Sequence, residues 1–316
     1  MTTKVLVIGG GQSAEHEVSL ASAAAVAAAL RMGDHEVTCV TIDCDGIWRV
    51  EGRPHGGSAA ESLALALPLL TRTDVVFPAV HGAPGEDGAL AALCALAGVR
   101  VVGSGLHAGA IGMDKWTTKL VADAVGLGTA RGRLVSADDI GDVEFEGEVV
   151  VKPVSSGSSH GVGLVTREED LLVALHEAAR FDRRILVEEV VRGREIDVAV
   201  LREKGGIRWA APPLEIHATG LFDTATKYDG SARFTVPAQL DAGEVSALKR
   251  AAIAVFDALG CEGVARMDFF LTDRGPVLNE VNTMPGLTAA SQVPRMFAAA
   301  GVTYVDLVAR LVRAAS

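Results

Sequence analysis

The order strand, glycine turn, helix, strand at the start of the chain restricts the possible folds more than any other feature. Residues 4–8 form an apolar, β-branched run, and residues 9–11 are three glycines. A helix is predicted over about 17–31, and further strands are predicted over 36–43 and 74–80. This order predicts a parallel α/β sheet, with loops lining a crevice at the carboxyl ends of its strands.

The rest of the chain continues as α/β and then as α+β. The glycine-rich residues 101–112 are predicted to form a domain boundary. Beyond them the pattern predicts, in order, a helix from 113 to about 124, a strand at 149–153, a helix at 168–180, strands at 185–191 and around 195–201, a polar segment at 217–234, a helix at 243–259, a hairpin at 264–282 and a terminal helix at about 303–313.

Size and charge restrict the class of protein. The 316 residues allow two or three domains, and the net charge of −11 argues against a nucleic-acid surface. No run approaches the roughly 18–20 apolar residues of a membrane helix, so we expect no membrane association. The four cysteines (Cys39, Cys44, Cys94 and Cys261) lack metal or disulfide spacing and are expected to be reduced, buried thiols of a cytoplasmic protein.

The hairpin carries an unusual polar face. Glu280 and Asn282 interrupt an apolar strand two residues apart, so they share one face. A loop of about three or five residues would bring Asp268 of the preceding strand onto the same face. Two carboxylates and an amide are hard oxygen ligands that suit Mg²⁺ or Mn²⁺. The hairpin alone also permits the polar face of an ordinary amphipathic sheet; Arg266 is the one cation of that face.

Mg²⁺ held by few carboxylates usually serves phosphates, and candidate phosphate ligands occur in the central part. Lys152 ends a strand and is followed by a serine- and glycine-rich loop that includes Ser159. Lys115 is a second candidate, although alone it is typical of a helix surface. The strand end that follows predicts a nucleotide edge or, alternatively, ordinary strand-end charges. Glu188 and the backbone near Val190 would read an adenine, and Glu195 would take ribose hydroxyls; Glu189 and Val191 are further candidates for the cofactor-binding site.

Taken together, these stretches resemble the ATP-grasp superfamily and, more closely, the D-alanine–D-alanine ligase family. The resemblance covers almost the whole chain. It is carried, in order, by GGGQSAEHEVS (9–19), HGAPGEDG (81–88), GSGLHAGAIGMDKWTTK (103–119), VVVKPVSSGSS (149–159), TKY (226–228), ARMDFFL (265–271) and NEVNTMPGLT (279–288).

The resemblance implies an ATP-grasp fold of three domains: a Rossmann-like substrate domain at 1–103, a central domain at 104–187 and a metal-binding domain at 188–316. ATP and two Mg²⁺ (or Mn²⁺) ions would lie between the last two, under a mobile loop at 217–234. It also implies a cytoplasmic homodimer that activates D-alanine as an acyl phosphate, which a second D-alanine attacks.

The resemblance also implies a role for each matching residue. Glu15 would hold the first substrate's ammonium, with Ser158 and Tyr228 in its hydrogen-bonding network and His81 near the substrate. Lys115, Lys152 and Lys227 would contact phosphates. Arg266 and the Gly286 N–H would form the oxyanion site, Ser291 and Gln292 would meet the second substrate, and the metal ligands would be Asp268, Glu280 and Asn282.

Several positions depart from the family pattern. Phe222 and Thr224 stand where tyrosines are frequent, His160 where a small apolar residue is usual, and Ala91 where glutamine is common. Gln292 replaces an apolar residue beside the second-substrate pocket. The acceptor therefore stays open among D-alanine, D-serine, D-lactate and a substrate of an antibiotic producer.

Two other classes compete with this interpretation. A nicotinamide dehydrogenase would use Gly9, Gly11 and Ala14 as its dinucleotide turn. However, Glu15 and Glu17 would then repel the pyrophosphate, and the hairpin carboxylates would have no role. A non-catalytic amino-acid-binding protein would not need the metal and phosphate ligands.

Overall fold

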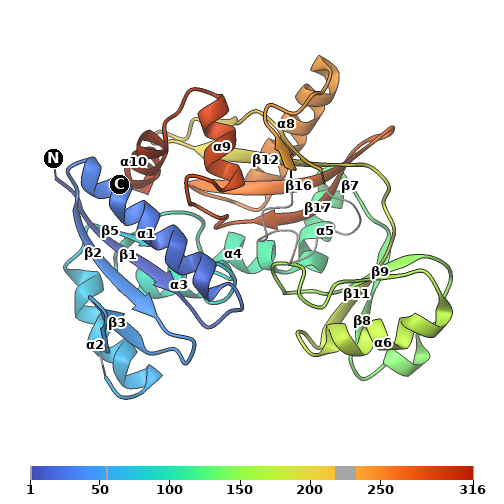
Figure 1. Cartoon of the computed structure of the whole chain (residues 1–316), viewed down its shortest axis with the longest axis horizontal. Coiled ribbons are helices and arrows are strands. Elements are labelled where there is room, and N and C mark those ends of the chain that lie inside the picture. Colours follow the sequence, from blue (N-terminus) through green and yellow to red (C-terminus); the bar gives the residue numbers. More distant parts are fainter. Residues whose placement is uncertain (1, 55, 218–232, 316) are drawn as a thin grey trace.

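The computed structural model describes residues 2–54, 56–217 and 233–315, whose strands form three sheets along the chain (Figure 1). In the described ranges, no helix is both long enough and apolar enough to cross a membrane. Cys94 and Cys261 are buried as expected, but Cys44 is exposed and Cys39 is half-buried, and all four thiols are free.

The N-terminal sheet contains the predicted parallel α/β unit. Its strand order is β4 (Arg53–Pro54), β3 (Trp48–Val50), β2 (Glu36–Ile42), β1 (Lys4–Gly10), β5 (Val75–Pro78) and β6 (Arg100–Val101). Strands β2, β1, β5 and β6 pair in parallel, whereas β3 and β4 add an antiparallel edge. Helix α1 (His16–Met32) covers one face, and α2 (Ala59–Thr71) and α3 (Ala89–Leu96) cover the other. Side chains of β1 alternate between these two cores, which explains why the strand is apolar at each position from Val5 to Ile8.

The central sheet is antiparallel throughout. Its order is β10 (Gly163–Val165), β9 (Val149–Pro153), β11 (Arg184–Glu189) and β8 (Gly132–Ser136). Val151 packs in the core that helix α6 (Glu168–Ala179) forms with this sheet. Because neighbouring side chains of a strand point to opposite faces, Lys152 lies on the face away from α6.

The C-terminal sheet is the largest. Its order is β15 (Arg233–Thr235), β14 (Leu214–His217), β12 (Arg194–Arg202), β16 (Val264–Thr272), β17 (Gly275–Asn282) and β7 (Gly128–Thr129), with β13 (Arg208–Ala210) beside β12. Helix α8 (Ala242–Ala258) packs on its apolar face together with α4 (Leu106–Met113) and α5 (Lys115–Ala124). The opposite face of β12, β16 and β17 carries the polar hairpin residues.

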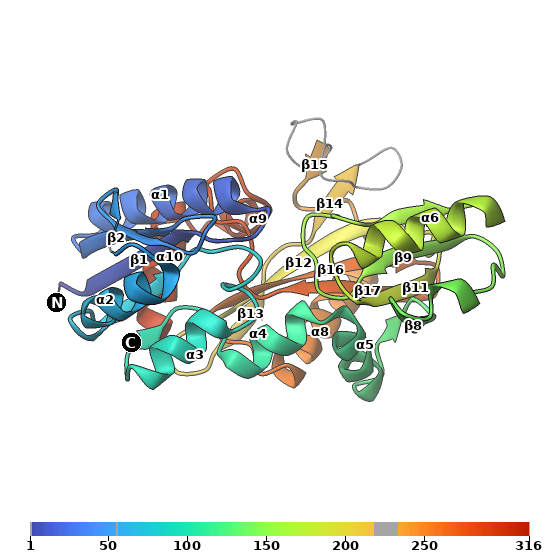
Figure 2. The same ribbon diagram turned by 90° about the horizontal axis from the view of Figure 1, so that it is seen from below.

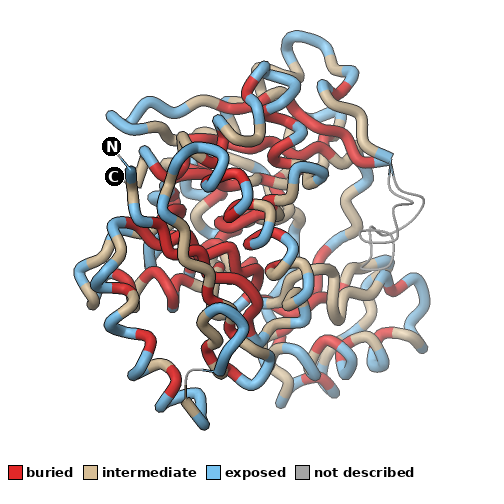
Figure 3. Tube along the Cα trace, turned by 60° about the vertical axis from the view of Figure 1, so that its left-hand side comes forward, coloured by how far each residue is buried: buried red, intermediate tan, exposed pale blue. Residues whose placement is uncertain are grey.

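The C-terminal helices return to the N-terminal sheet. Helix α10 (Tyr304–Ala315) lies beside α1, and α9 (Gln292–Ala299) lies next to it (Figures 1 and 2). Their apolar residues share one core with β1, β5 and α1, and Figure 3 shows this buried interior. The first and last parts of the chain are thus packed into one body.

Two connections differ from the sequence prediction. The glycine-rich residues 101–112 include helix α4, and the helix expected from 113 begins at Lys115. The side chain of Asp114 accepts a hydrogen bond from the Thr117 N–H at 2.7 Å, which starts α5 as a separate helix. The division at 1–103, 104–187 and 188–316 stays a proposal; α4 and α5 contact β17 of the C-terminal sheet.

Candidate active site

A cavity of about 1150 Å³ lies where the three sheets meet. Every predicted site residue in the described part of the chain lines this cavity: Glu15, His81, Lys115, Lys152, Ser158, Ser159, Glu188, Glu189, Val191, Glu195, Arg266, Asp268, Glu280, Asn282, Gly286, Ser291 and Gln292. Lys227 and Tyr228 lie outside the described residues, as do Phe222, Thr224 and most of the segment 217–234. The chemical roles of these residues stay predictions.

The β16–β17 hairpin places its two carboxylates directly opposite each other. Asp268 pairs with Glu280 across the strands, as predicted. The predicted loop of three or five residues is wrong, because only Asp273 and Arg274 separate the strands. A β-bulge restores the parity: Phe269 pairs with Leu278, so Asn279 is an extra residue on β17.

The bulge adds a polar group that sequence reasoning missed. Asn279 lines the cavity together with Glu280, and its Oδ1 accepts a hydrogen bond from Lys152 Nζ at 3.2 Å. In a regularly alternating strand, Asn279 and Glu280 would point to opposite faces, so only one of them would line the cavity. The residue types of β17 do not predict a bulge, so sequence periodicity could not have found this contact.

The side-chain oxygens of the hairpin suit a hard divalent cation of the kind that takes its remaining ligands from phosphates. Asp268 and Glu280 supply carboxylates, and Asn282 donates to Asp268 Oδ2 at 3.0 Å, which brings its amide to the same place. Within the described ranges, no group of three or more His, Cys, Asp and Glu side chains could hold a metal by itself. Mg²⁺ commonly binds one or two carboxylates and completes its shell with phosphate oxygens and water.

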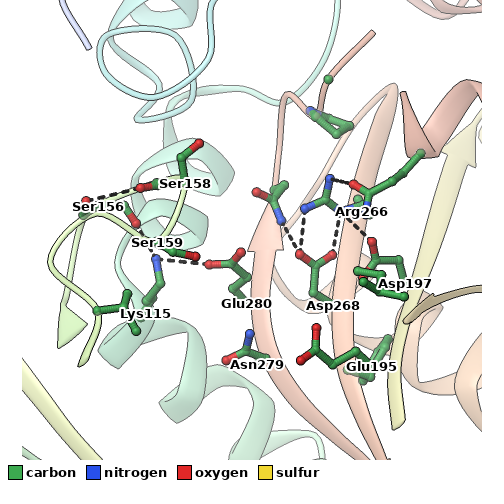
Figure 4. Close-up of a pocket in the computed structure, with 18 of the residues that line it drawn as sticks. Lys115, Ser156, Ser158, Ser159, Glu195, Asp197, Arg266, Asp268, Asn279 and Glu280 are labelled. Carbon is green, nitrogen blue, oxygen red and sulfur yellow. Dashed lines mark hydrogen bonds and ion pairs between the residues drawn. The ribbon is translucent and has the colours of Figure 1, made fainter. Parts of the chain in front are cut away.

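Arg266 is half-buried among acidic groups of the same sheet face (Figure 4). It donates to both Asp268 oxygens, at 2.6 and 2.7 Å, and its Nε lies 3.5 Å from Asp197 Oδ2. Its third nitrogen donates to Gln292 Oε1 at 2.7 Å. Burial alone would lower the pKa of Arg266, but Asp268 and Asp197 outweigh it and raise the pKa. A fixed positive charge therefore faces the cavity beside the hairpin carboxylates.

The serine-rich loop approaches the start of α1. Ser158 Oγ donates to Glu15 Oε1, and Gly157 allows this approach, since a Cβ there would lie 2.7 Å from Glu15 Oε2. Ser158 and Ser159 both have left-handed backbone angles, with φ of 49° and 58°. Such conformations are costly for residues other than glycine and are concentrated at ligand-binding loops.

Two lysines face the cavity beside the serine-rich loop. Lys115 Nζ donates to the Ser156 carbonyl at 2.7 Å and lies 3.3 Å from Glu280 Oε2 (Figure 4). Lys152 Nζ lies 2.6 Å from Glu188 Oε2. Glu188 also forms an ion pair with Lys119, a residue that was not predicted as part of the site. Its spacing of four residues from Lys115 on one helix was the available signal.

The nucleotide edge predicted after β11 lies at the same cavity. Glu189 and Val191 line it, and Glu189 Oε1 accepts from the Arg131 N–H at 3.0 Å. Glu195 lines it from β12, the next strand in the chain, which belongs to the C-terminal sheet. The cavity lining therefore extends from Lys115 and Lys152 to the residues that follow β11.

His81 fastens the turn that follows the hairpin. Its Nδ1 donates to the Met284 carbonyl at 2.8 Å, because that oxygen can only accept. Its Nε2 then accepts from Ser22 Oγ at 2.9 Å, and Ser22 Oγ accepts from the Leu287 N–H at 3.2 Å. Burial lowers the pKa of His81 and outweighs the opposing effect of Glu15. This neutral imidazole holds the turn through partners far away in the sequence.

The same turn carries the proposed second-substrate residues. Ser291 Oγ accepts from the Thr288 N–H at 3.1 Å and bonds the Thr288 hydroxyl at 2.8 Å. A Cβ at Gly286 would lie 3.2 Å from Ser291 Oγ, so a larger residue would crowd this turn. Its backbone therefore stays accessible from the cavity.

Glu86 is a further buried acid beside the cavity that was not predicted. It accepts from the Gly82 N–H at 3.0 Å. Burial and the nearby Glu15 raise the pKa of Glu86 to about 8. Its carboxyl group is therefore mostly neutral at pH 7.

Two of the departures from the family pattern lie away from the cavity lining. His160 lies in the serine-rich loop and stacks on Phe181, with ring centroids 5.9 Å apart. Ala91 is buried in α3.

Comparisons with known proteins agree with this geometry. Residues 143–313 match the family described as D-ala D-ala ligase C-terminus, and residues 4–66 match D-ala D-ala ligase N-terminus. The D-alanine--D-alanine ligase of Mycolicibacterium vanbaalenii is 39% identical, over 99% of this chain and 96% of that relative.

Solved structures give the same result. The D-alanine-D-alanine ligase from Coxiella burnetii superimposes with a TM-score of 0.81 at 30% identity, over 99% of this chain and 94% of that one. The VanG D-Ala:D-Ser ligase from Enterococcus faecalis superimposes with a TM-score of 0.82 at 28% identity, over the full length of both chains.

Proposed function

Because the chain belongs to the D-alanine–D-alanine ligase family, we propose that it joins two D-alanine molecules while converting ATP to ADP and phosphate. The product, D-alanyl-D-alanine, is a peptidoglycan precursor, so the role is in cell-wall synthesis. The observation that carries this proposal is one cavity lined by phosphate-type lysines, hairpin carboxylates and the Glu15–Ser158 pair.

The nucleotide would occupy the part of the cavity next to the central sheet. Lys115 and Lys152 would contact its phosphates, with the backbone N–H groups of the loop at Ser159. Glu188, Glu189 and Val191 would border the adenine, and Glu195 the ribose.

The hairpin would hold Mg²⁺ or Mn²⁺ through Asp268, Glu280 and Asn282. When bound, the cations offset the negative charge of the transferring phosphoryl group. The protein contributes a fixed direct pairing of the two carboxylates.

The first D-alanine would bind with its ammonium group at Glu15, whose carboxylate accepts a hydrogen bond from Ser158 Oγ, and His81 would lie near this substrate. One of its carboxylate oxygens attacks the γ-phosphorus of ATP, ADP leaves, and an acyl phosphate results. The amine of the second D-alanine then attacks the acyl carbon, and phosphate leaves with the oxygen that formed the bond to phosphorus.

The tetrahedral centre of this second attack carries a negative oxygen. Arg266 would stabilise it together with the N–H of Gly286, because both face the cavity beside the hairpin. Ser291 would bind the carboxylate of the second substrate, and Gln292 would lie beside its side chain.

A polar acceptor is the second candidate. Gln292 places an amide beside Arg266, at 2.7 Å, where an apolar residue would favour the methyl group of D-alanine. D-Serine, D-lactate or a related D-acid of an antibiotic producer would be the acceptor in that case. We further propose that the enzyme works in the cytoplasm as a homodimer.

The test is phosphate release from ATP and Mg²⁺ in the presence of single D-amino and D-hydroxy acids. Release that depends on D-alanine, with D-alanyl-D-alanine found by mass spectrometry, supports the proposal. A dipeptide or depsipeptide with another acceptor would favour the second candidate. No release with any of these acids would contradict ligase activity.

A further inference from the structure

Three buried charged side chains form a continuous chain behind the phosphate side of the cavity. Glu188 lies between two lysines: its Oε1 is paired with Lys119 and its Oε2 with Lys152, the latter at 2.6 Å. Lys119 is 8% exposed, and the other two are each 5% exposed. Of these three, Glu188 and Lys152 line the cavity, whereas Lys119 is not part of its described lining.

Local structure brings the three residues together. Lys119 lies one turn after Lys115 on α5, and its Nζ also donates to the Ala130 carbonyl. Glu188 and Lys152 lie on the paired strands β11 and β9, where Leu186 is opposite Lys152. Residues two positions apart on a strand share a face, so Glu188 reaches Lys152 diagonally across the sheet.

The charges of this chain depend on one another. Burial would raise the pKa of Glu188, but Lys152 and Lys119 outweigh it and lower the pKa. Glu188 is therefore ionised, and it needs at least one cation because a buried, unpaired carboxylate is strongly unfavourable.

Lys152 is held by two groups that compete with a phosphate. One is Glu188, and the other is Asn279, whose Oδ1 accepts from its Nζ at 3.2 Å. If Lys152 were the sole partner of Glu188, moving it to a phosphate would leave the carboxylate unpaired. With Lys119 in place, Glu188 keeps a cation on its other oxygen.

We propose that Lys119 is a positioning residue for nucleotide binding: it remains paired with Glu188 and so leaves Lys152 able to contact the phosphates. This inference rests on the proposed ATP-dependent function. Lys119 acts through Glu188 and does not touch the nucleotide. The competing explanation is that Lys119 only fastens α5 to the loop at Ala130.

The test measures binding of ADP and of inorganic tripolyphosphate by calorimetry with Mg²⁺. Tripolyphosphate carries no base, so its binding does not depend on the proposed adenine contacts of Glu188. Lys119→Gln keeps a donor for the Ala130 carbonyl but removes the charge, and Lys119→Arg keeps the charge. Lys249→Gln on α8 is the matched control, since α8 packs on the opposite face of the C-terminal sheet.

We expect Lys119→Gln to weaken binding of both ligands at least tenfold and to raise the KM for ATP, with the KM for D-alanine within twofold. Lys119→Arg should stay within threefold of the wild type, and Lys249→Gln should match it. The double variant Lys119→Gln/Glu188→Gln should bind tripolyphosphate at least threefold more tightly than Lys119→Gln, because no carboxylate then retains Lys152.

Unchanged ADP binding by Lys119→Gln, or a double variant that binds tripolyphosphate no more tightly than Lys119→Gln, would overturn the inference. If Lys119→Gln does not fold, Glu188→Gln is compared with the double variant. Without the carboxylate, loss of Lys119 should change tripolyphosphate binding less than threefold, and a larger loss would overturn the inference. Failure of the wild-type protein to bind ADP would instead contradict the proposed function.

Discussion

Asp268 and Glu280 face each other directly across the β16–β17 hairpin, and the extra residue Asn279 makes this pairing possible. A two-residue loop without the bulge would have turned one carboxylate toward the apolar core. The bulge therefore places both carboxylates on the cavity face.

Replacing Glu280 by glutamine should abolish turnover while the fold stays intact. The amide has the same shape but lacks the charge that would bind the cation. We therefore expect kcat to fall by about a hundredfold or more. Steady-state phosphate release and the thermal unfolding midpoint are the measurements. Glu262→Gln, which alters an ion pair with Arg202 on the surface, is the control. Near-normal turnover of Glu280→Gln would remove Glu280 from the metal site.

Replacing Gln292 by leucine should change acceptor preference. The substitution removes the amide that accepts from Arg266 at 2.7 Å and leaves an apolar surface beside the second substrate. We expect the product ratio to shift toward D-alanine and away from D-serine and D-lactate, by about 10-fold or more. Mass spectrometry of products from mixed acceptors measures this ratio. Identical ratios in both proteins would show that the position has no part in acceptor choice.

Replacing Gly157 by alanine should weaken binding of the first D-alanine. A Cβ at this position would lie 2.7 Å from Glu15 Oε2, so the serine loop must move away from Glu15. We expect the KM for the first D-alanine to rise about tenfold with an unchanged unfolding midpoint. Gly141→Ala is the matched control, because a Cβ there meets no atom within 4 Å. Equal KM values in the two variants would contradict the proposed role of Glu15.

The pH dependence of stability should reveal Glu86. Burial, and secondly Glu15, raise the pKa of its carboxyl group from 4.5 to about 8. Between these values the folded protein holds a proton that the unfolded chain releases. The stabilisation by this proton is complete below pH 4.5 and is lost as the pH rises to about 8.

Thermal unfolding across this range compares the wild type with Glu86→Gln. The wild-type midpoint should fall relative to that of the variant as the pH rises, because the glutamine does not titrate. Parallel curves for the two proteins would show that Glu86 titrates alike in the folded and unfolded states.

The fold could be predicted from the sequence where the signal is local. The strand β1, its glycine turn and α1 follow from apolar runs and a helical period within about thirty residues. The hairpin carboxylates could be placed on one face by parity, but for a wrong reason, because the bulge at Asn279 and not the loop length sets the register.

Contacts between distant segments could not be predicted in this way. His81 meets the Met284 carbonyl 203 residues further along the chain, and Lys119 meets Glu188 across 69 residues. Neither partner has a local pattern that points to the other. Glu86 was missed for the same reason, since its raised pKa depends on burial that only the assembled sheets produce.

The most direct test of the central claim follows the oxygen atoms of the first substrate. D-Alanine labelled with ¹⁸O in both carboxylate oxygens is incubated with ATP, Mg²⁺ and the enzyme, and the released phosphate is examined by mass spectrometry. Activation of the carboxylate by ATP in this cavity predicts one ¹⁸O atom in each phosphate released for each dipeptide formed. Dipeptide formation with unlabelled phosphate would contradict the acyl phosphate and the proposed roles of the residues around it.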